Sequence, residues 1–273
     1  MRPAPEIREQ VMADIKKEVL IMNIVTIDEV DFCVNDGVLI SMEYFGSIPK
    51  SVNIPKILPG GIEIGAIGPR FCQGLFNAIS VADSIEDVRC FAFASSNVHT
   101  IYWPTMCKRI PSNCFSYSTA KYIHGISDVC DVSSNAFAYS SFGCIHWPRA
   151  VTVIPFNCFY NCSASRIEDL ELVTFVGEQA FGDSNIKELR WPLWCDTIPE
   201  RCFKFGTFGT IQGLEYVSNI KSEAFSEVSS STPIDFSGAI LCDVADDAFS
   251  GVDPDLVVIS PYYSEKLLNV NYS

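Results

Sequence analysis

Apolar positions recur along this chain at a fixed interval. Phenylalanine returns in steps of 22, at positions 71, 93, 115, 137, 159, 181, 203 and 225, and again at 249 after a step of 24. Upstream of each phenylalanine the apolar residues keep one spacing, for which Leu170, Val173, Val176, Ala180 and Phe181 are an example. A period of this size is typical of repeat architectures, in which similar units stack one on the next.

The repeat has two alternating forms. In one form a Trp-Pro pair lies upstream and cysteine precedes the phenylalanine; the residues, which recur at every second step, are Trp103, Trp147 and Trp191, and Cys114, Cys158 and Cys202. In the other form alanine takes the cysteine position, at Ala92, Ala136, Ala180 and Ala224. The structural unit therefore equals the interval between successive phenylalanines, and the two forms alternate along the array.

Each unit also contains one short strand candidate with a recurrent inward residue. These residues are Ile79, Ile101, Ile123, Ile145, Ile167, Leu189 and Ile211, continued less regularly by Ile234 and Val258. A strand of four or five residues cannot bury its own apolar side, so the units should stack into a solenoid with one parallel strand per turn. Nine strands at roughly 4.8 Å spacing predict a sheet on the order of 40 Å long.

The repeat unit resembles the BspA-type leucine-rich repeat. The segment "DFCVNDGVLISMEYFGSIPKSVNIPKI", residues 31–57, is similar to the hairpin and first strand that open such arrays. The resemblance implies a mainly β, right-handed repeat solenoid, and a binding role, because proteins of this family are commonly surface or secreted adhesins of microbes and protists. Two features depart from the pattern: tryptophan replaces the usual second strand isoleucine in three repeats, and residues 55–71 are out of register.

Three segments follow from this pattern. Residues 1–30 are expected to form an N-terminal helix and cap, residues 31–260 the solenoid with regular repeats over about 76–250, and residues 261–273 a C-terminal cap. Ile7, Val11 and Ile15 fall on one face of the predicted helix. That helix would either cover the open N-terminal coil, since solenoid ends need covers, or join another subunit through residues 1–22.

Charge and hydropathy limit the partners. A formal net charge of −14 argues against nucleic acid and anionic membrane surfaces as partners. The longest apolar run, residues 19–25, is too short to span a bilayer, and it follows a mixed-charge stretch unlike the start of a signal peptide. We therefore expect no membrane insertion and favour folding in a reducing cytoplasm.

The spacing of the twelve cysteines does not indicate a disulfide framework. Cys114, Cys158 and Cys202 lie two coils apart, or roughly 9.6 Å, whereas a disulfide needs Cα atoms within about 7 Å. Cys107 and Cys195 occupy the position of Val151 and should also pack as small apolar residues; the other seven are less constrained by the period. Many free thiols are typical of a reducing compartment.

Candidate chemistry is sparse. The sequence contains no phosphate loop, no paired zinc-type cysteine motifs and no nucleophile motif, so we predict no enzyme and no cofactor. Strand alternation instead predicts two outward rows across the sheet: one holds Tyr102, His124, His146, Glu168, Arg190 and Gln212, the other Thr100, Tyr122, Cys144, Arg166, Glu188 and Thr210. His124, Cys144 and His146 would share one face within reach of a common transition metal; we favour a solvated polar ladder and predict no metal site.

Two functional hypotheses remain. The first is a non-enzymatic, adhesin-like binding scaffold that presents the concave sheet to a protein partner, or to a glycan. Its partner site is predicted to centre on Tyr102, Tyr122, His124, His146, Arg166 and Arg190, because tyrosine and arginine often carry interface energy. The second is a structural or attachment component of a larger assembly, such as a phage particle, joined through the N-terminal helix.

Overall fold

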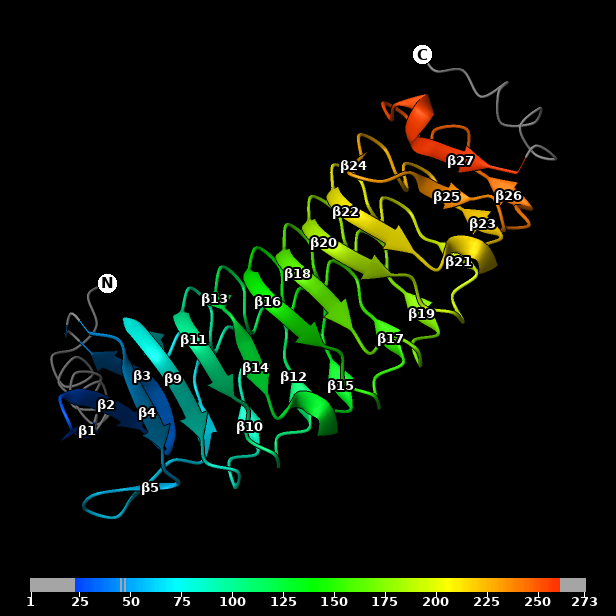
Figure 1. Ribbon diagram of the computed structural model, residues 1–273. Coiled ribbons are helices and arrows are strands. Elements are labelled where there is room, and N and C mark those ends of the chain that lie inside the picture. The colour runs from blue at the N-terminus through cyan, green and yellow to red at the C-terminus, as the bar shows by residue number, and fades with distance from the viewer. Residues whose placement is uncertain (1–22, 45, 47, 261–273) are drawn as a thin grey trace, which may run out of the picture.

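The structure is a computed structural model that describes residues 23–44, 46 and 48–260. Of the predicted N-terminal helix and cap (residues 1–30), residues 1–22 lie outside the described residues, as does the predicted C-terminal cap (residues 261–273), and both stay predictions. Residues 23–27 form a strand. The described chain is a mainly β solenoid, and each coil adds a strand to one long sheet (Figure 1). The predicted repeat architecture is confirmed.

The main sheet has ten strands and is parallel throughout. In spatial order they are β4 (Lys50–Ile54), β9 (Leu75–Val81), β11 (Asn97–Tyr102), β13 (Thr119–Ala120) with β14 (Tyr122–His124), β16 (Ser141–His146), β18 (Ser163–Glu168), β20 (Asn185–Arg190), β22 (Thr207–Gln212) and β24 (Ser229–Ser230). From β9 to β22 the predicted inward residues are buried, and Ile101 pairs with Ile79 and Ile123 at equal steps along the chain.

Shorter strands line the opposite side of the coils. They pair as β12 (Arg109–Ile110) with β15 (Asp131–Val132), β17 (Val153–Ile154) with β19 (Phe175–Val176), and β21 (Thr197–Ile198) with β23 (Asn219–Ile220) and β26 (Asp243–Val244). At the C-terminal end β25 (Ile234–Phe236) pairs with β27 (Val257–Ile259). Helical elements within the described residues are three 3₁₀ turns: η1 (Ile126–Asp128), η2 (Leu214–Tyr216) and η3 (Pro254–Leu256).

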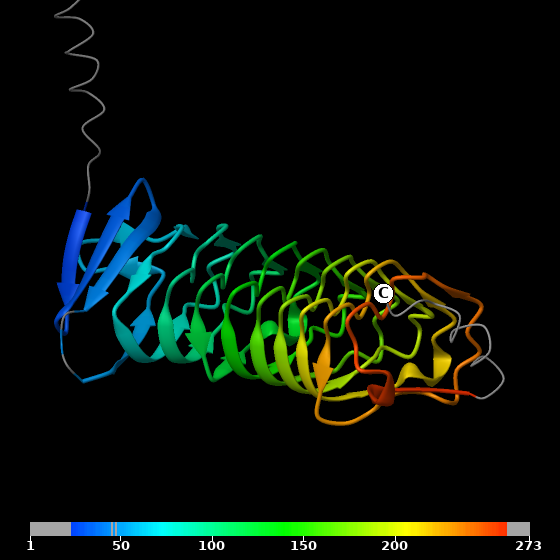
Figure 2. The same ribbon diagram turned by 90° about the horizontal axis from the view of Figure 1, so that it is seen from above.

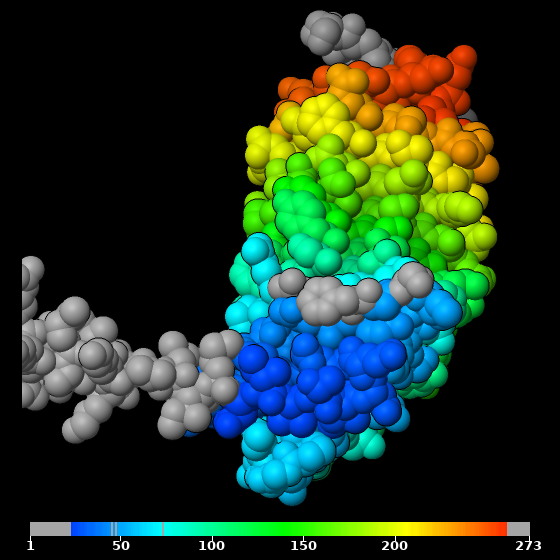
Figure 3. Space-filling model, turned by 90° about the vertical axis from the view of Figure 1, so that its left-hand side faces the viewer, coloured from blue at the N-terminus to red at the C-terminus, as the bar shows by residue number. Residues whose placement is uncertain are grey.

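An antiparallel layer closes the N-terminal end of the solenoid. It consists of β1 (Asn23–Ile27), β2 (Val30–Asn35) and β3 (Val38–Tyr44), and β3 continues the sheet into β7 (Ala66–Ile67), β8 (Cys72–Gln73) and β10 (Asp87–Val88). Asp36 and Gly37, both at positive φ, make the tight turn between β2 and β3. Figure 2 shows this layer across one end of the coils, and Figure 3 shows it from outside.

The first coil is longer than the others. Val52 of β4 pairs with Ile79 of β9, and the chain between these two partners is longer than the chain between Ile79 and Ile101 in the next coil. The extra length is a small antiparallel excursion made by β5 (Ile57–Leu58) and β6 (Ile62–Glu63). This excursion explains why residues 55–71 are out of register with the repeat.

A column of phenylalanine rings runs through the core along the solenoid axis. From Phe115 to Phe203 each ring stacks on the ring of the next coil, with centroids 5.2–5.6 Å apart and planes within 13°. The rings at 93, 225 and 249 continue the stack. We call this set the phenylalanine column; it joins all regular coils into one continuous core.

The tryptophans and cysteines of the repeat are core residues. Trp103, Trp147 and Trp191 are 2% exposed, and each indole N–H donates to the backbone oxygen four residues ahead, at 2.7–3.0 Å. The cysteines in the alanine position are fully buried, and all twelve cysteines are free thiols. The Trp-Pro motif therefore fills the core and satisfies its own polar atom, as buried tryptophan requires.

Two positions differ from the sequence-based expectation. Val258, predicted to face inward, is exposed, because Ile234 pairs with Val257 and the register has slipped by one residue. Thr100, predicted to lie in an outward row, is buried beside the larger Tyr122, and its hydroxyl lies 3.0 Å from Nδ1 of His99. The first error comes from a slip in register, and the second from extrapolating exposure from strand alternation alone.

Candidate binding surface

An aromatic cluster stands on the exposed face of the main sheet. The rings of Tyr102 and His124 are 5.2 Å apart, and those of Tyr122 and His124 are 6.0 Å apart and stacked. His99 meets Tyr122 edge-on at 5.7 Å, and the ammonium of Lys121 lies 5.1 Å from the Tyr122 ring centre. All five residues are exposed, and they lie on two neighbouring coils. We call these five residues the aromatic cluster.

The aromatic cluster lies beside a break in the sheet. Lys121 separates β13 from β14; β13 pairs onward with β16, whereas β14 pairs with β11. Beyond the break, a Cβ added to Gly143 would lie 2.7 Å from the carbonyl oxygen of Lys121, so only glycine allows this close approach. At the break no hydrogen-bonded ladder joins β14 to β16, although the two strands stay in contact.

The remaining predicted residues form a separate polar group on β16 and β18. His146 Nδ1 lies 3.0 Å from Asp169 and 3.5 Å from Glu168, and its Nε2 lies 3.8 Å from the Cys144 sulfur. Arg166 forms an ion pair with Glu168 at 3.3 Å. The structure thus brings Tyr102, Tyr122 and His124 together, joins His146 to Arg166 through Glu168, and places Arg190 on the next strand, β20.

The potential metal ligands differ from those the sequence suggested. Cys144, His146 and Glu168 have ligand atoms within 4.8 Å of one another, whereas His124 lies against the tyrosine rings instead. Glu168 is already paired with Arg166, and His146 already contacts Asp169. We therefore interpret this group as a polar ladder in which Glu168 pairs with His146 on the neighbouring strand and with Arg166 on its own strand.

The thiol of Cys144 is poorly suited to nucleophilic chemistry. Burial raises the pKa of Cys144 to about 11, and the negative charge of Glu168 adds to the shift. A thiol with a raised pKa is almost entirely protonated at neutral pH, and the thiolate is the reactive form. The one cysteine beside a histidine on this face therefore carries little of the reactive thiolate at neutral pH.

Family comparison identifies the repeat. The family model for the BspA type leucine rich repeat region matches in six copies, over residues 63–164 and 130–253, which together cover more than half of the chain. The chain belongs to the BspA-type leucine-rich repeat family. No significant match is found among the curated proteins.

Comparison with solved structures finds matches of low sequence identity. This BspA-type chain is similar to the pneumococcal vaccine antigen PcpA, with 13% identity, a TM-score of 0.44, and 87% and 82% of the two chains covered. It is also similar to a leucine-rich repeat protein from Bacteroides ovatus (15%, TM-score 0.30, 88% and 79%). A leucine-rich cell surface protein from Faecalibacterium prausnitzii matches at 12%, with a TM-score of 0.26 and coverage of 81% and 94%.

Other surfaces of this BspA-type protein were not apparent from the predicted rows. Tyr117 and Tyr139 are exposed and stack at 4.8 Å on the turn that precedes the main sheet. Beside them, seven of the ten main strands begin with a small polar residue; these residues are Asn97, Thr119, Ser141, Ser163, Asn185, Thr207 and Ser229. Both sets obey the repeat period, so the signal was present in the sequence but outside the strand positions considered.

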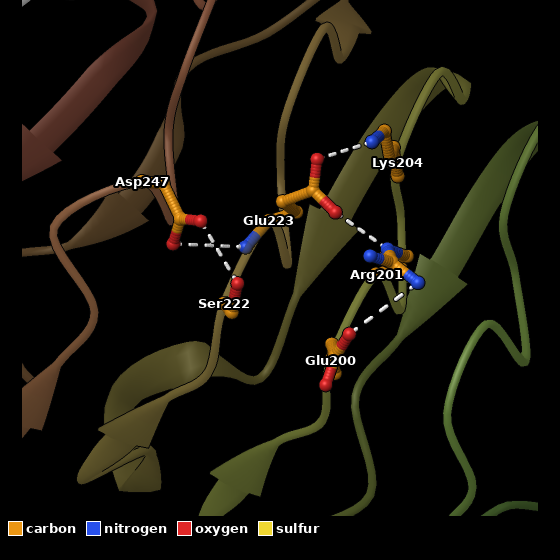
Figure 4. Close-up of polar contacts among 6 residues, drawn as sticks. All are labelled: Glu200, Arg201, Lys204, Ser222, Glu223 and Asp247. Atoms are coloured by element: carbon orange, nitrogen blue, oxygen red, sulfur yellow. Dashed lines mark hydrogen bonds and ion pairs between the residues drawn. The ribbon is translucent and has the colours of Figure 1, made fainter.

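A shallow hollow and a charged network lie on the short-strand side. The hollow, of about 640 Å³, is lined by residues that include Asp87, Arg89 and Arg109. Figure 4 shows the network: Glu223 pairs with Arg201 and Lys204 of the preceding coil, and its backbone N–H donates to Asp247 of the following coil at 3.3 Å. The network ties three consecutive coils together.

Membrane crossing by a helix finds no support in the structure. Within the described residues no helix has the length and apolar character that crossing a bilayer requires.

Proposed function

We propose that this protein is a non-enzymatic binding scaffold that presents the exposed face of its main sheet to a protein partner. The observation that carries the proposal is the aromatic cluster, in which two tyrosines and two histidines stand exposed on a rigid parallel sheet. Rigid aromatic side chains supply contact area at low entropic cost, and tyrosine is enriched among interface residues that dominate affinity. Repeat solenoids commonly bind through such extended surfaces.

The polar group on β16 and β18 would form the rim of this site. Arg166 and Glu168 are partly exposed and paired, so they exclude water and set orientation more than they add affinity. Arg190 on β20 has no ion pair among the residues the structure describes, which leaves its guanidinium available to a partner carboxylate. The predicted partner site, from Tyr102 to Arg190, thus becomes an aromatic centre with a charged edge.

A catalytic role has little support from the same residues. The protonated Cys144 thiol lacks the activation that a nucleophile needs. The charged groups of the face pair with one another: Glu168 with Arg166 and His146, and Asp169 with His146. These features favour recognition over chemistry.

The proposal can be tested with a partner screen that includes two matched double variants. Tyr102→Ala/Tyr122→Ala removes the aromatic centre, and Tyr117→Ala/Tyr139→Ala removes a second exposed tyrosine pair, on the turns that precede the main sheet. We expect both variants to melt close to the wild type, and a protein partner of the wild type to bind the second variant but not the first.

Two results would count against the sheet face. A partner that binds both variants as tightly as the wild type would place the site elsewhere. If a glycan, and no protein, binds Tyr117→Ala/Tyr139→Ala but not Tyr102→Ala/Tyr122→Ala, the ligand is a glycan and not a protein. The alternative of an assembly component joined through residues 1–22 concerns a segment outside the described residues and stays a prediction.

A further inference from the structure

An exposed apolar stripe runs along the edge of the solenoid in its C-terminal half. Its members are Leu172 (53% exposed), Leu193 (46%), Trp194 (64%), Tyr216 (57%) and Ile240 (69%). Trp194 is the exposed one among four tryptophans, since the other three are buried in the core. We call these five residues the apolar stripe.

Pairing of the short strands shows that the stripe is continuous. Thr197 of β21 pairs with Asn219 of β23, and Asn219 pairs with Asp243 of β26, so Trp194, Tyr216 and Ile240 occupy equivalent positions on successive coils. One coil earlier, Leu172 stands one full repeat before Trp194. Neighbouring coils are roughly 4.8 Å apart, so four coils give a stripe about 14 Å long. The turns that carry it join β18 to β19, β20 to β21, β22 to β23 and β25 to β26 (Figure 1).

The fold itself does not require large apolar side chains at this position. In the N-terminal half the same position holds Met106, Asp128 and Ala150. The phenylalanine column passes through both halves of the solenoid. A contiguous row of exposed apolar side chains marks an interaction site more often than a single exposed apolar side chain does. We therefore interpret the stripe as an interaction site.

Unpaired acidic side chains flank the apolar stripe. The four turns that carry it, residues 169–175, 190–197, 212–219 and 238–243, contain one basic residue, Arg190, and five acidic residues: Asp169, Glu171, Asp196, Glu215 and Asp243. Within the described part of the chain Glu171, Asp196 and Glu215 form no ion pair, whereas Asp169 and Asp243 do. The edge therefore combines an apolar ridge with an uncompensated negative charge.

We propose that the apolar stripe docks a cationic amphipathic helix of a partner protein. A helix rises about 5.4 Å per turn, close to the roughly 4.8 Å between coils, so one apolar residue per turn can fit between successive side chains of the stripe. About three turns span its length. Lysines or arginines on the two flanks of that helix would meet Glu171, Asp196 and Glu215.

Charge also decides between this occupant and a second copy of the chain. Two copies that met through the stripe would bring the same acidic flanks face to face, and like charges across an interface are unfavourable. A basic helix removes that repulsion and pairs the free carboxylates. The stripe lies off the sheet face, so this inference does not depend on the proposed sheet-face function.

The probe is a fluorescein-labelled peptide of about 14 residues, with leucines at i, i+3, i+7 and i+10 and lysines on both flanks. Binding is followed by anisotropy with the full chain. We expect saturable binding that weakens about tenfold or more in Trp194→Ala and in Leu172→Ala, as for an interface anchor. Met106→Ala, at the equivalent exposed position of an earlier coil, should bind like the wild type, as should Tyr102→Ala/Tyr122→Ala.

The charge component is tested separately. Glu171→Gln/Glu215→Gln should bind more weakly than the wild type and show a shallower dependence on salt. A scrambled peptide of the same composition should bind at least about tenfold more weakly, because its leucines no longer share one face.

Several outcomes would overturn the inference. Equal binding of the scrambled peptide, or unchanged affinity in Trp194→Ala, would show attraction without docking on the stripe. Self-association of the wild type, lost in Trp194→Ala and seen by sedimentation without peptide, would assign the stripe to a second copy.

Discussion

At the scale of single residues, the position before each core phenylalanine accepts only small side chains. Cys114, Cys158 and Cys202 alternate with alanines there, and all of them are fully buried. The phenylalanine that follows stacks on rings of both neighbouring coils. The two adjacent positions therefore differ sharply in how much contact each side chain makes.

The first prediction compares two neighbouring substitutions. Phe159→Ala should lower the free energy of unfolding by about 3–5 kcal/mol, because it leaves a cavity in the phenylalanine column. Cys158→Ala should cost about 1 kcal/mol, since it removes one methylene-sized group and restores the residue of the intervening coils. Denaturant unfolding of both variants measures the difference; equal losses would contradict the column as the main source of packing energy.

The second prediction concerns thiol reactivity. Cys90, Cys130 and Cys242 are exposed, Cys144 is partly buried and the other eight cysteines are buried. Burial raises the pKa of several of the buried thiols, Cys162 to about 12. A thiol reagent should therefore modify about three groups quickly in the native protein and all twelve after unfolding without reductant. Recovery of two or fewer from the unfolded chain would mean that disulfides are present.

Burial of these residues could be predicted, whereas the partners of exposed residues could not. The period assigns Trp103 and Cys158 to the core because a missing core contact would break the stack. It says nothing about whether His124 turns toward Tyr102 or toward Cys144, since either choice leaves the coil intact. The grouping of the outward residues therefore appeared only in the structure.

At the scale of elements, the strands depart from simple alternation. Phe142 and Ile145 are both buried although they lie three positions apart, and the pairing between β16 and β18 skips one position between them. The sequence predicted a single inward residue per strand, because only one strand position carries the same residue type, isoleucine or leucine, in successive coils. The second inward position, three residues earlier, holds side chains of different size, so its period was hidden. These residues are Val98, Ala120, Phe142 and Ala164.

The third prediction concerns the charged network between coils. Hydrogen bonds from Lys204, and then from Arg201, lower the pKa of Glu223 below its ordinary value. A lowered folded-state pKa stabilises the protein above the unfolded-state pKa, and this stabilisation is lost as the pH falls through the folded-state pKa. Glu223→Gln should therefore melt at a lower temperature than the wild type at neutral pH. This difference in melting temperature should become smaller in acid.

Melting curves across the acidic range, for the wild type and Glu223→Gln, measure this effect. Glu171→Gln is the matched control, since Glu171 has no ion pair among the described residues. A gap between wild type and Glu223→Gln that stays constant down to strongly acidic pH would mean that the network contributes no pH-dependent stability.

At the scale of the whole molecule, the array is modular. Each coil contacts its two neighbours through strand pairing, and the phenylalanine column passes from one coil to the next. The repeat fold could be predicted because one local pattern, repeated many times, leaves a single way to bury it. The extra excursion between β5 and β6 and the break at Lys121 could not, since each occurs once.

The fourth prediction uses this modularity. Removing residues 123–166 deletes two whole coils and joins Tyr122 to Ile167, which occupies the position of Ile123. The shortened chain should fold with lower stability, because stability is roughly a sum over coils and their interfaces. A deletion of one and a half coils from the same point joins a strand to a turn and should not fold. Circular dichroism and thermal melting distinguish the two, and similar behaviour of both chains would contradict the modular reading.

The stacked geometry also determines how the molecule would respond to tension. The first and last described strands lie at opposite ends of the solenoid, so a pull on the two ends acts along its axis (Figure 1). Each coil would peel from the next by opening a few short-strand hydrogen bonds, and its chain would lengthen from one coil spacing to roughly 70 Å. Such a molecule would unfold stepwise under force. Single-molecule stretching should show a series of small, evenly spaced extension steps in place of one abrupt rupture.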